Sequence, residues 1–121
     1  MEKMLRVLKV EPNKSPYEKK IGKELEDQQN EVGGEIATFD LDDECLVIYN
    51  NNGKLENADP NRRYKNDIIR GPFLICGYDE GGDFISLTDE QVERYAQMFK
   101  QIEEFTGYEP ELAARVQVFS F

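Results

Sequence analysis

The chain has 121 residues, and its 25 acidic and 15 basic side chains give it a net charge of −10. This length suits one domain with a single core. The charge opposes direct binding to nucleic acid or to anionic membranes, and it favours basic protein partners. The sequence contains no histidine, so it lacks the commonest general base and the usual ligand of zinc and iron sites. We therefore expect a protein that is not an enzyme.

The charge is divided into segments along the chain. Residues 24–61 carry eleven acids and one base, and residues 79–121 carry ten acids and three bases. Residues 1–23 and 62–78 are basic overall. Two acidic blocks that are separated in sequence can still form one face of a folded protein.

Three features bear on the location of the protein. No stretch approaches the roughly 18 apolar residues of a membrane span, and the first residues are charged, unlike a signal peptide. Cys45 and Cys76 each lie in an apolar run, which favours buried thiols in a reducing compartment over a disulfide. We expect a cytoplasmic protein.

In the first half of the chain, the pattern predicts four strands and one helix. Residues 5–10 form a short apolar strand, and a weaker strand at 17–22 pairs back on it. Helix-forming residues at 23–32 precede a Gly-Gly pair, which ends helices readily. Strands at 36–41 and 45–49 follow, joined by an acidic turn.

The middle of the chain is expected to be rich in turns. The run Asn50-Asn51-Asn52-Gly53 predicts a hairpin, because Asn and Gly tolerate the positive φ of tight turns. Residues 54–63 lack periodicity and contain Pro60, which indicates a loop. A buried strand at 73–76 then leads through a turn at 79–82 into an apolar stretch at 84–87.

The clearest helix is expected at about 89–105. Thr88 is a good N-cap, with Gln91 at the capping-box position and Gly107 as the stop. The apolar positions at helical spacing, which should face the core, are Val92, Tyr95, Ala96, Phe99 and Ile102. The alternating tail at 115–121 can add an edge strand. We predict one α+β domain over residues 1–121, with a mainly antiparallel sheet packed by two helices at about 23–32 and 89–105.

The acidic turn offers oxygen ligands for calcium or magnesium through Asp40, Asp42, Asp43 and Glu44. The regular twelve-residue calcium loop with its central Gly is absent, so we predict no metal site and no cofactor. Two interpretations remain for this turn: a solvated acidic loop, or part of a surface that mimics phosphates.

A second candidate lies at Asn61, Arg62 and Arg63, in the predicted loop. Long loops in small domains are often functional, and arginine forks hold carboxylates or phosphates. This would make the protein an enzyme or a binder of small ligands. The alternative is structural: Asn61 caps a turn and an arginine pins the acidic surface from within.

Several blocks of the sequence resemble, in order, an uncharacterised family of small proteins that is classed as a domain of unknown function. The blocks, which span about residues 4–100, are Met4 to Pro12, Leu25 to Gly34, Pro60-Asn61-Arg62, Asp67 to Phe73 and Phe84 to Gln91. The resemblance implies a gene of phages, plasmids or conjugative elements, mostly of Firmicutes, and hence a bacterial host cell. Residues 109–121 match no part of the pattern and are expected to be an extension specific to this member.

Charge and resemblance together lead to one functional hypothesis. We expect an anti-defence protein that inhibits a host enzyme acting on nucleic acid, either a CRISPR effector nuclease or a restriction enzyme, by occupying its basic groove. The alternative is a regulatory or accessory module that binds a protein of the element's own replication or transfer machinery. The predicted partner-binding residues are Glu24, Glu26, Asp27, Glu31, Asp40, Asp42, Asp43 and Glu44.

Overall fold

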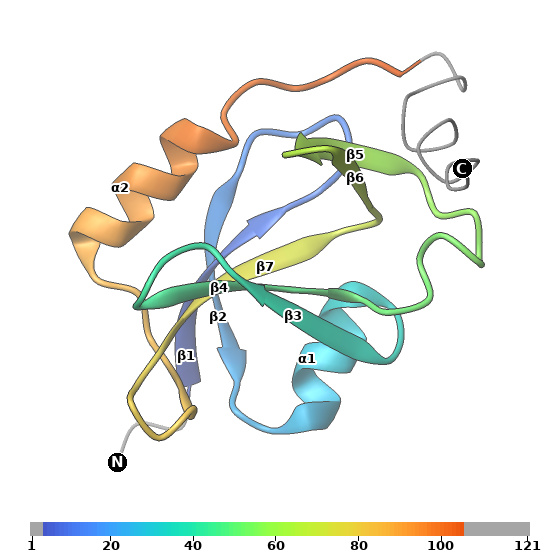
Figure 1. The fold of residues 1–121 in the computed structure, drawn as a ribbon. Coiled ribbons are helices and arrows are strands. Elements are labelled where there is room, and N and C mark those ends of the chain that lie inside the picture. Colours follow the sequence, from blue (N-terminus) through green and yellow to red (C-terminus); the bar gives the residue numbers. More distant parts are fainter. Residues whose placement is uncertain (1–3, 106–121) are drawn as a thin grey trace.

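A computed structural model describes residues 4–105, which contain eight strands and two helices (Figure 1). In chain order these are β1 (Met4–Val10), β2 (Tyr17–Gly22), α1 (Leu25–Val32), β3 (Ile36–Asp40), β4 (Cys45–Asn50), β5 (Pro60–Tyr64), β6 (Asp67–Arg70), β7 (Phe73–Tyr78), β8 (Phe84–Ile85) and α2 (Asp89–Met98). The predicted extension at 109–121 and its edge strand lie outside the described residues.

One six-stranded sheet forms the centre of the fold. Its strand order is β2-β1-β7-β4-β3, and every pairing is antiparallel. The first half of β7 pairs with β1 through Val10↔Phe73, and its second half pairs with β8 through Gly77↔Ile85. β5 and β6 form a separate two-stranded hairpin. The predicted α+β class, with a mainly antiparallel sheet and two helices, is confirmed.

The two helices pack on opposite faces of this sheet. Alternate residues of a strand point to opposite faces. β4 and β7 are apolar at consecutive positions, and β1 is apolar at Leu5 and Val7 on one face and at Leu8 and Val10 on the other, so all three strands are buried on both faces. The core cluster on the α1 face contains Leu5, Val7, Ile21, Val32, Leu46, Ile48, Leu74 and Cys76. The cluster on the α2 face contains Leu8, Val10, Cys45, Val47, Ile69, Phe73, Ile75, Leu87, Tyr95 and Phe99.

Both cysteines are buried free thiols, as the sequence predicts. Burial raises the pKa of Cys45 to about 11 and that of Cys76 to about 12, so both are protonated at neutral pH. They belong to the two different core clusters.

Among the described residues, no helix is long and apolar enough to cross a membrane.

The second helix is shorter than predicted. α2 ends at Met98, and Ile102, expected in the core, is 43% exposed. After the helix, the Lys100 N–H donates a hydrogen bond to the Gln97 carbonyl, which forms a tighter turn. The Phe99 carbonyl accepts a hydrogen bond from Arg62 Nε at 3.0 Å. Apolar spacing alone extended the prediction beyond this point, because the contact with Arg62 joins residues 37 positions apart.

Two predictions for the middle of the chain are wrong. The chain turns at Asn50 to Gly53, but no hairpin forms there, because β4 is already flanked by β3 and β7. The predicted loop at 54–63 contains the first four residues of β5. Pro60 is tolerated at the first position of this two-stranded hairpin, next to a register irregularity between Pro60 and Arg62.

Candidate partner-binding surface

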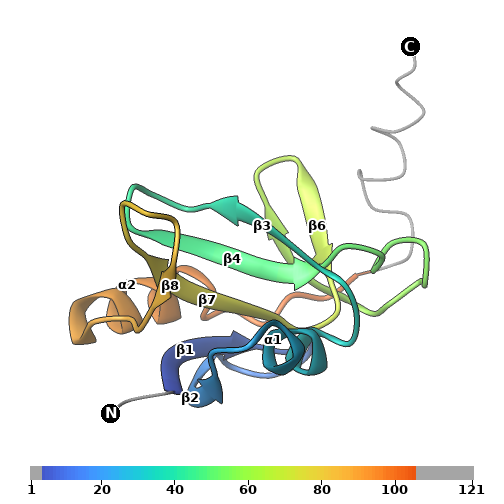
Figure 2. The same cartoon turned by 90° about the horizontal axis from the view of Figure 1, so that it is seen from below.

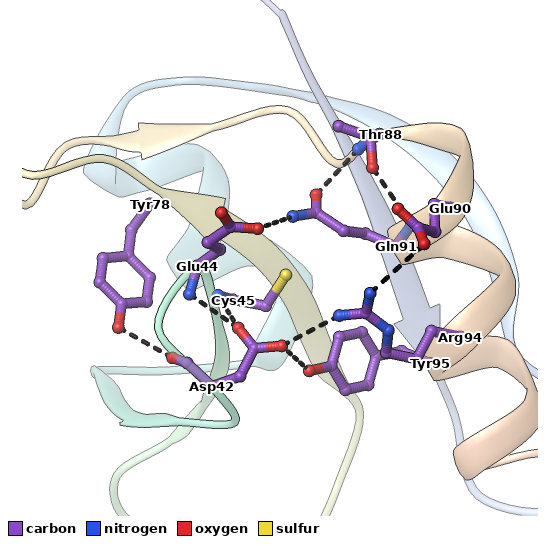
Figure 3. Close-up of polar contacts among 9 residues, drawn as sticks. All are labelled: Asp42, Glu44, Cys45, Tyr78, Thr88, Glu90, Gln91, Arg94 and Tyr95. Atoms are coloured by element: carbon purple, nitrogen blue, oxygen red, sulfur yellow. Dashed lines mark hydrogen bonds and ion pairs between the residues drawn. The ribbon is translucent and has the colours of Figure 1, made fainter.

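The acidic turn between β3 and β4 is fixed to helix α2 through Asp42 (Figure 3). One oxygen of this carboxylate, Oδ1, accepts the backbone N–H groups of Glu44 at 2.7 Å and Cys45 at 2.8 Å. The other, Oδ2, accepts the Tyr95 hydroxyl and Arg94 Nη1, the latter at 3.3 Å. Asp42 is therefore a structural residue, and the interpretation of the turn as a merely solvated loop is wrong for this side chain.

Glu44 makes a second connection between the turn and α2. Thr88 and Gln91 form the predicted capping box at the start of the helix. The Gln91 side chain accepts the Thr88 N–H at 2.9 Å through Oε1, and its Nε2 donates to Glu44 Oε1 at 3.2 Å. One glutamine thus caps the helix and holds the acidic turn.

The protonation states within this network are set by its hydrogen bonds. Burial acts to raise the pKa of Asp42, but hydrogen bonds from Tyr95 and from the backbone of Glu44 and Cys45 outweigh it and hold that pKa below its ordinary value. Burial and the Asp42 carboxylate raise the pKa of Tyr95 to about 12. At neutral pH, Asp42 is ionised and Tyr95 is a hydrogen-bond donor.

A second acidic turn, between β7 and β8, lies beside the first. The pair Cys45↔Gly77 sets the start of β4 against the end of β7, so the turn that precedes β4 and the turn that follows β7 leave the sheet at the same place. The Tyr78 N–H donates to the Glu44 carbonyl at 2.9 Å, and the Tyr78 hydroxyl donates to the Asp42 carbonyl at 2.9 Å. Burial is the largest cause that raises the pKa of Tyr78, and the negative charges of Asp40, Asp43 and Asp42 raise it further.

Three segments therefore meet at one end of the molecule: the β3–β4 turn, the β7–β8 turn and the first turn of α2 (Figure 2). We call the side chains that they present the acidic end, which consists of Asp40, Asp42, Asp43, Glu44, Asp79, Glu80, Asp83 and Glu90. The last four were missed by sequence analysis, which interpreted residues 79–82 only as a turn. If the antiparallel pairing of β4 with β7 had been predicted, it would have indicated that the acids of the β7–β8 turn lie beside the β3–β4 turn.

The acids of α1 lie elsewhere. Figure 2 shows α1 away from the β3–β4 turn, toward the other end of the sheet. Glu31 Oε1 accepts Lys9 Nζ at 2.8 Å and Lys19 Nζ at 2.9 Å. The eight predicted residues therefore do not form one face.

The side chain of Asp27 organises the start of α1. Asp27 Oδ2 accepts the Glu24 N–H at 3.1 Å, which satisfies an otherwise unpaired donor at the helix start. A Cβ at Gly22 would lie 2.0 Å from this same oxygen, so the cap requires the glycine. Glu24 and Glu26 are exposed.

The second candidate, on β5, is mostly interior. Asn61 and Arg62 are each 1% exposed. Asn61 Nδ2 donates to the carbonyls of Val10 and Gly71, both at 2.9 Å. Arg62 donates to the Phe99 carbonyl at 3.0 Å, to the Lys14 carbonyl at 2.7 Å and to Asn61 Oδ1 at 2.8 Å. These contacts join β5 to β1, to the β1–β2 loop and to the end of α2.

Arg63 points to the surface, where its Nη1 lies 2.8 Å from Glu103 Oε1. The arginine that pairs with an acid is thus Arg63, whereas Arg62 binds carbonyl oxygens. Neither Asn61 nor Arg62 can reach an external carboxylate or phosphate without leaving the core. The geometry of this trio supports the structural interpretation over a small-ligand site.

A family model described as a domain of unknown function, DUF3846, matches residues 4–100. The chain belongs to this family. The match covers the whole sheet, both helices and the acidic end, and it agrees with the extent of the sequence blocks that resemble the family. No curated protein and no solved structure matches the chain.

The described part of this DUF3846 protein contains no group of three or more Cys, Asp or Glu side chains arranged to hold a metal ion. At the acidic end, Asp42 and Asp79 each have several close partners, and all of these partners are hydrogen-bond donors. What this surface offers chemically is negative charge on a fixed scaffold.

Proposed function

We propose that this protein inhibits another protein by non-enzymatic binding, and that its acidic end occupies a basic nucleic-acid-binding surface. The observation that supports this is the convergence of acids from two distant parts of the sequence, residues 40–44 and 79–90, at one end of the fold. The side chains of Asp43, Glu80 and Asp83 are exposed there. They are in a position to meet a partner directly.

The display of charge suits a nucleic-acid mimic. Duplex DNA carries one negative charge per about 1.7 Å of its axis, and proteins that bind it present matching basic grooves. Opposite charge on an inhibitor accelerates encounter with such a groove. The bonds of Asp42 and Glu44 to α2 fix the turn before binding, which lowers the entropic cost of ordering it in a complex.

We further propose that the target is a host defence enzyme, either a CRISPR effector nuclease or a restriction enzyme. The support for this finer statement is the resemblance to proteins of phages, plasmids and conjugative elements, whose small genes often counter host defence. Such enzymes expose the long basic grooves that an acidic surface of this kind complements. Glu31 and Asp27 are not part of the proposed contact, because they are engaged within the fold. The exposed Glu24 and Glu26 are also left out, because they belong to the start of α1, which lies away from the acidic end (Figure 2).

The test uses two triple variants with the same change in charge. The test variant combines Asp43→Asn, Glu80→Gln and Asp83→Asn at the acidic end. The matched control combines Glu26→Gln, Glu35→Gln and Glu104→Gln, which are exposed positions away from it. Immobilised wild-type protein and both variants are incubated with host lysate, and the captured proteins are identified by mass spectrometry.

We expect wild type and control to capture a nuclease, and we expect added DNA or guide RNA to displace it. The test variant should associate with this nuclease at least about tenfold more slowly, because electrostatic steering of the encounter depends on local charge. Association should weaken steeply with salt, since exposed charges are screened beyond about 8 Å at physiological ionic strength. Capture of a protein encoded by the mobile element would favour the regulatory alternative. Equal capture by test variant and control would refute binding through the acidic end.

A further inference from the structure

A cleft of about 810 Å³ lies between the β3–β4 part of the sheet and the β5–β6 hairpin. It is bounded by Phe39 and Tyr49 on the sheet and by Tyr64 on the hairpin, and the loop after β4 contributes to its rim. Its volume falls in the range of about 300–1,000 Å³ that is typical of small-molecule sites. Of the residues that make up the acidic end, the cleft is lined only by Asp40.

Aromatic rings form the walls of this cleft. The Phe39 ring lies 5.0 Å from that of Tyr64 and 5.7 Å from that of Tyr49, centroid to centroid. All three are half-buried and pack with one side against the α2-face core. Such rings offer π-faces on which a planar ligand stacks.

The polar lining of the cleft differs from the rest of the protein. It includes three cations and two carboxylates, whereas the whole chain carries −10. These are Lys54, Lys65, Arg70, Asp40 and Asp67. Lys54 pairs with Asp67 at 2.5 Å, and Lys65 Nζ lies 5.5 Å from the centre of the Tyr64 ring. A cation therefore stands next to an aromatic wall, in a locally positive part of an acidic molecule.

From this juxtaposition we infer that the cleft binds a small planar aromatic anion. The ring of the ligand stacks on the wall formed by Phe39, Tyr49 and Tyr64, and its anionic group lies at the Lys65 side of the cleft. Amide side chains of Asn51 and Asn66 on the lining can donate or accept hydrogen bonds at the edge of the ring. A nucleoside monophosphate and an aromatic carboxylate both have this chemistry.

This site is independent of the proposed inhibitory function. It rests on the cleft rather than on the acidic end. It also differs from the small-ligand site that the sequence suggested at Asn61, Arg62 and Arg63. Asn61 and Arg62 are buried and engaged with backbone carbonyls, whereas Tyr64 and Lys65, next along the chain, line the cleft.

Calorimetric titration of the full-length protein tests the inference with four probes: the nucleoside 5′-monophosphates, salicylate, the uncharged nucleosides and inorganic phosphate. We expect saturable one-to-one binding of the monophosphates or of salicylate, and binding at least about tenfold weaker for nucleosides and phosphate alone. Whichever of the first two binds identifies the source of the anion. Absence of binding by both, or equal binding of phosphate alone, would overturn the inference.

Two variants locate the site. Tyr64→Leu removes a wall of the cleft and should weaken binding by about tenfold or more, in line with about 1–3 kcal/mol for a stacked base. Lys65→Gln, in the exposed hairpin turn, should weaken it by about threefold, whereas Lys23→Gln, an exposed lysine outside the cleft, should not.

Because Tyr64 also packs on the core, Tyr64→Leu can fail to fold. Amide chemical shifts of the wild-type protein therefore provide a second measurement. On titration, the shifts should move at residues 51–55 and 64–70 and stay fixed on α1. Shifts confined to other regions, or equal affinities for Lys65→Gln and Lys23→Gln, would show that the cleft is not the site.

Discussion

Glu31 on α1 and Asp43 in the β3–β4 turn belong to the same acidic block of the sequence, yet the fold places them in different environments. Glu31 lies between Lys9 and Lys19 and is mostly buried, with 17% of its side chain exposed. Asp43 is exposed at the acidic end. The comparison teaches that acidic composition has two uses here. Some carboxylates hold the helices and turns in place, and others remain for a partner.

The largest effect is expected inside the acidic end, at Asp42. Asp42→Ala should lower the free energy of unfolding by about 3 kcal/mol, because the buried Tyr95 hydroxyl and the N–H of Cys45 lose their acceptor. Asp43→Ala, one residue along, should change it by less than about 0.5 kcal/mol. Urea denaturation measures both. Equal midpoints for the two variants would contradict the distinction between structural and exposed acids in this turn.

A smaller effect is expected at Glu31. Glu31→Gln should cost about 2 kcal/mol, because Lys9, which is 9% exposed, loses the nearer of its two carboxylate partners. Glu26→Gln on the same helix is the control and should be close to neutral. If the two variants unfold at the same urea concentration, the lysine contacts of Glu31 contribute nothing to stability.

The Glu31 contacts also predict a dependence on pH. Burial acts to raise the pKa of Glu31, but hydrogen bonds from Lys9 and Lys19 outweigh it and hold that pKa below its ordinary value of 4.5. A group with a lowered folded-state pKa stabilises the fold fully above the unfolded value, and this contribution is lost as the pH falls through the folded one. The difference in free energy of unfolding between wild type and Glu31→Gln should therefore become smaller as the pH falls below 4.5. A gap that is constant down to pH 2 would argue against this ion pair.

The triple variant Asp43→Asn, Glu80→Gln and Asp83→Asn should fold normally. Its free energy of unfolding should stay within about 0.5 kcal/mol of wild type, since exposed side chains without packing roles contribute little. Thermal and urea denaturation provide the measurement. A large loss would mean that these carboxylates are structural, and binding results obtained with this variant would then need another explanation.

The smallest effect is expected from divalent metals. Saturating calcium or magnesium should leave the melting temperature of the wild-type protein nearly unchanged, because the close partners of Asp42 are hydrogen-bond donors. A specific site would raise the melting temperature progressively with ion concentration. Such a rise, abolished by Asp43→Asn but not by Glu26→Gln, would place a metal at the acidic end.

The strands and the start of α2 could be predicted because their signals are local. The apolar runs of β1, β4 and β7 and the Thr88 capping box each lie within a few residues. The same apolar runs also indicate on which faces of the sheet the helices pack, which the sequence-based prediction did not state. Apolar residues at consecutive positions, such as Leu46 and Val47, indicate burial on both faces and hence one helix on each.

The environment of the charges could not be predicted, because their partners are distant in sequence. Glu31 meets Lys9 across 22 positions, Gln91 meets Glu44 across 47, and Tyr95 meets Asp42 across 53. The β5–β6 hairpin was missed for a similar reason. Its sequence contains a proline and three charged residues within β5 and the start of its turn, and its burial depends on contacts with Val10, Gly71 and Phe99.

The contacts of Arg62 determine which parts of the molecule unfold together. A two-stranded hairpin is marginally stable by itself, and here one guanidinium connects it to the β1–β2 loop and to the end of α2. These three pieces are therefore expected to unfold as one cooperative unit. In native-state hydrogen exchange, the amides of β6 and of the last turn of α2 should share one opening free energy, although 30 residues or so of chain separate them.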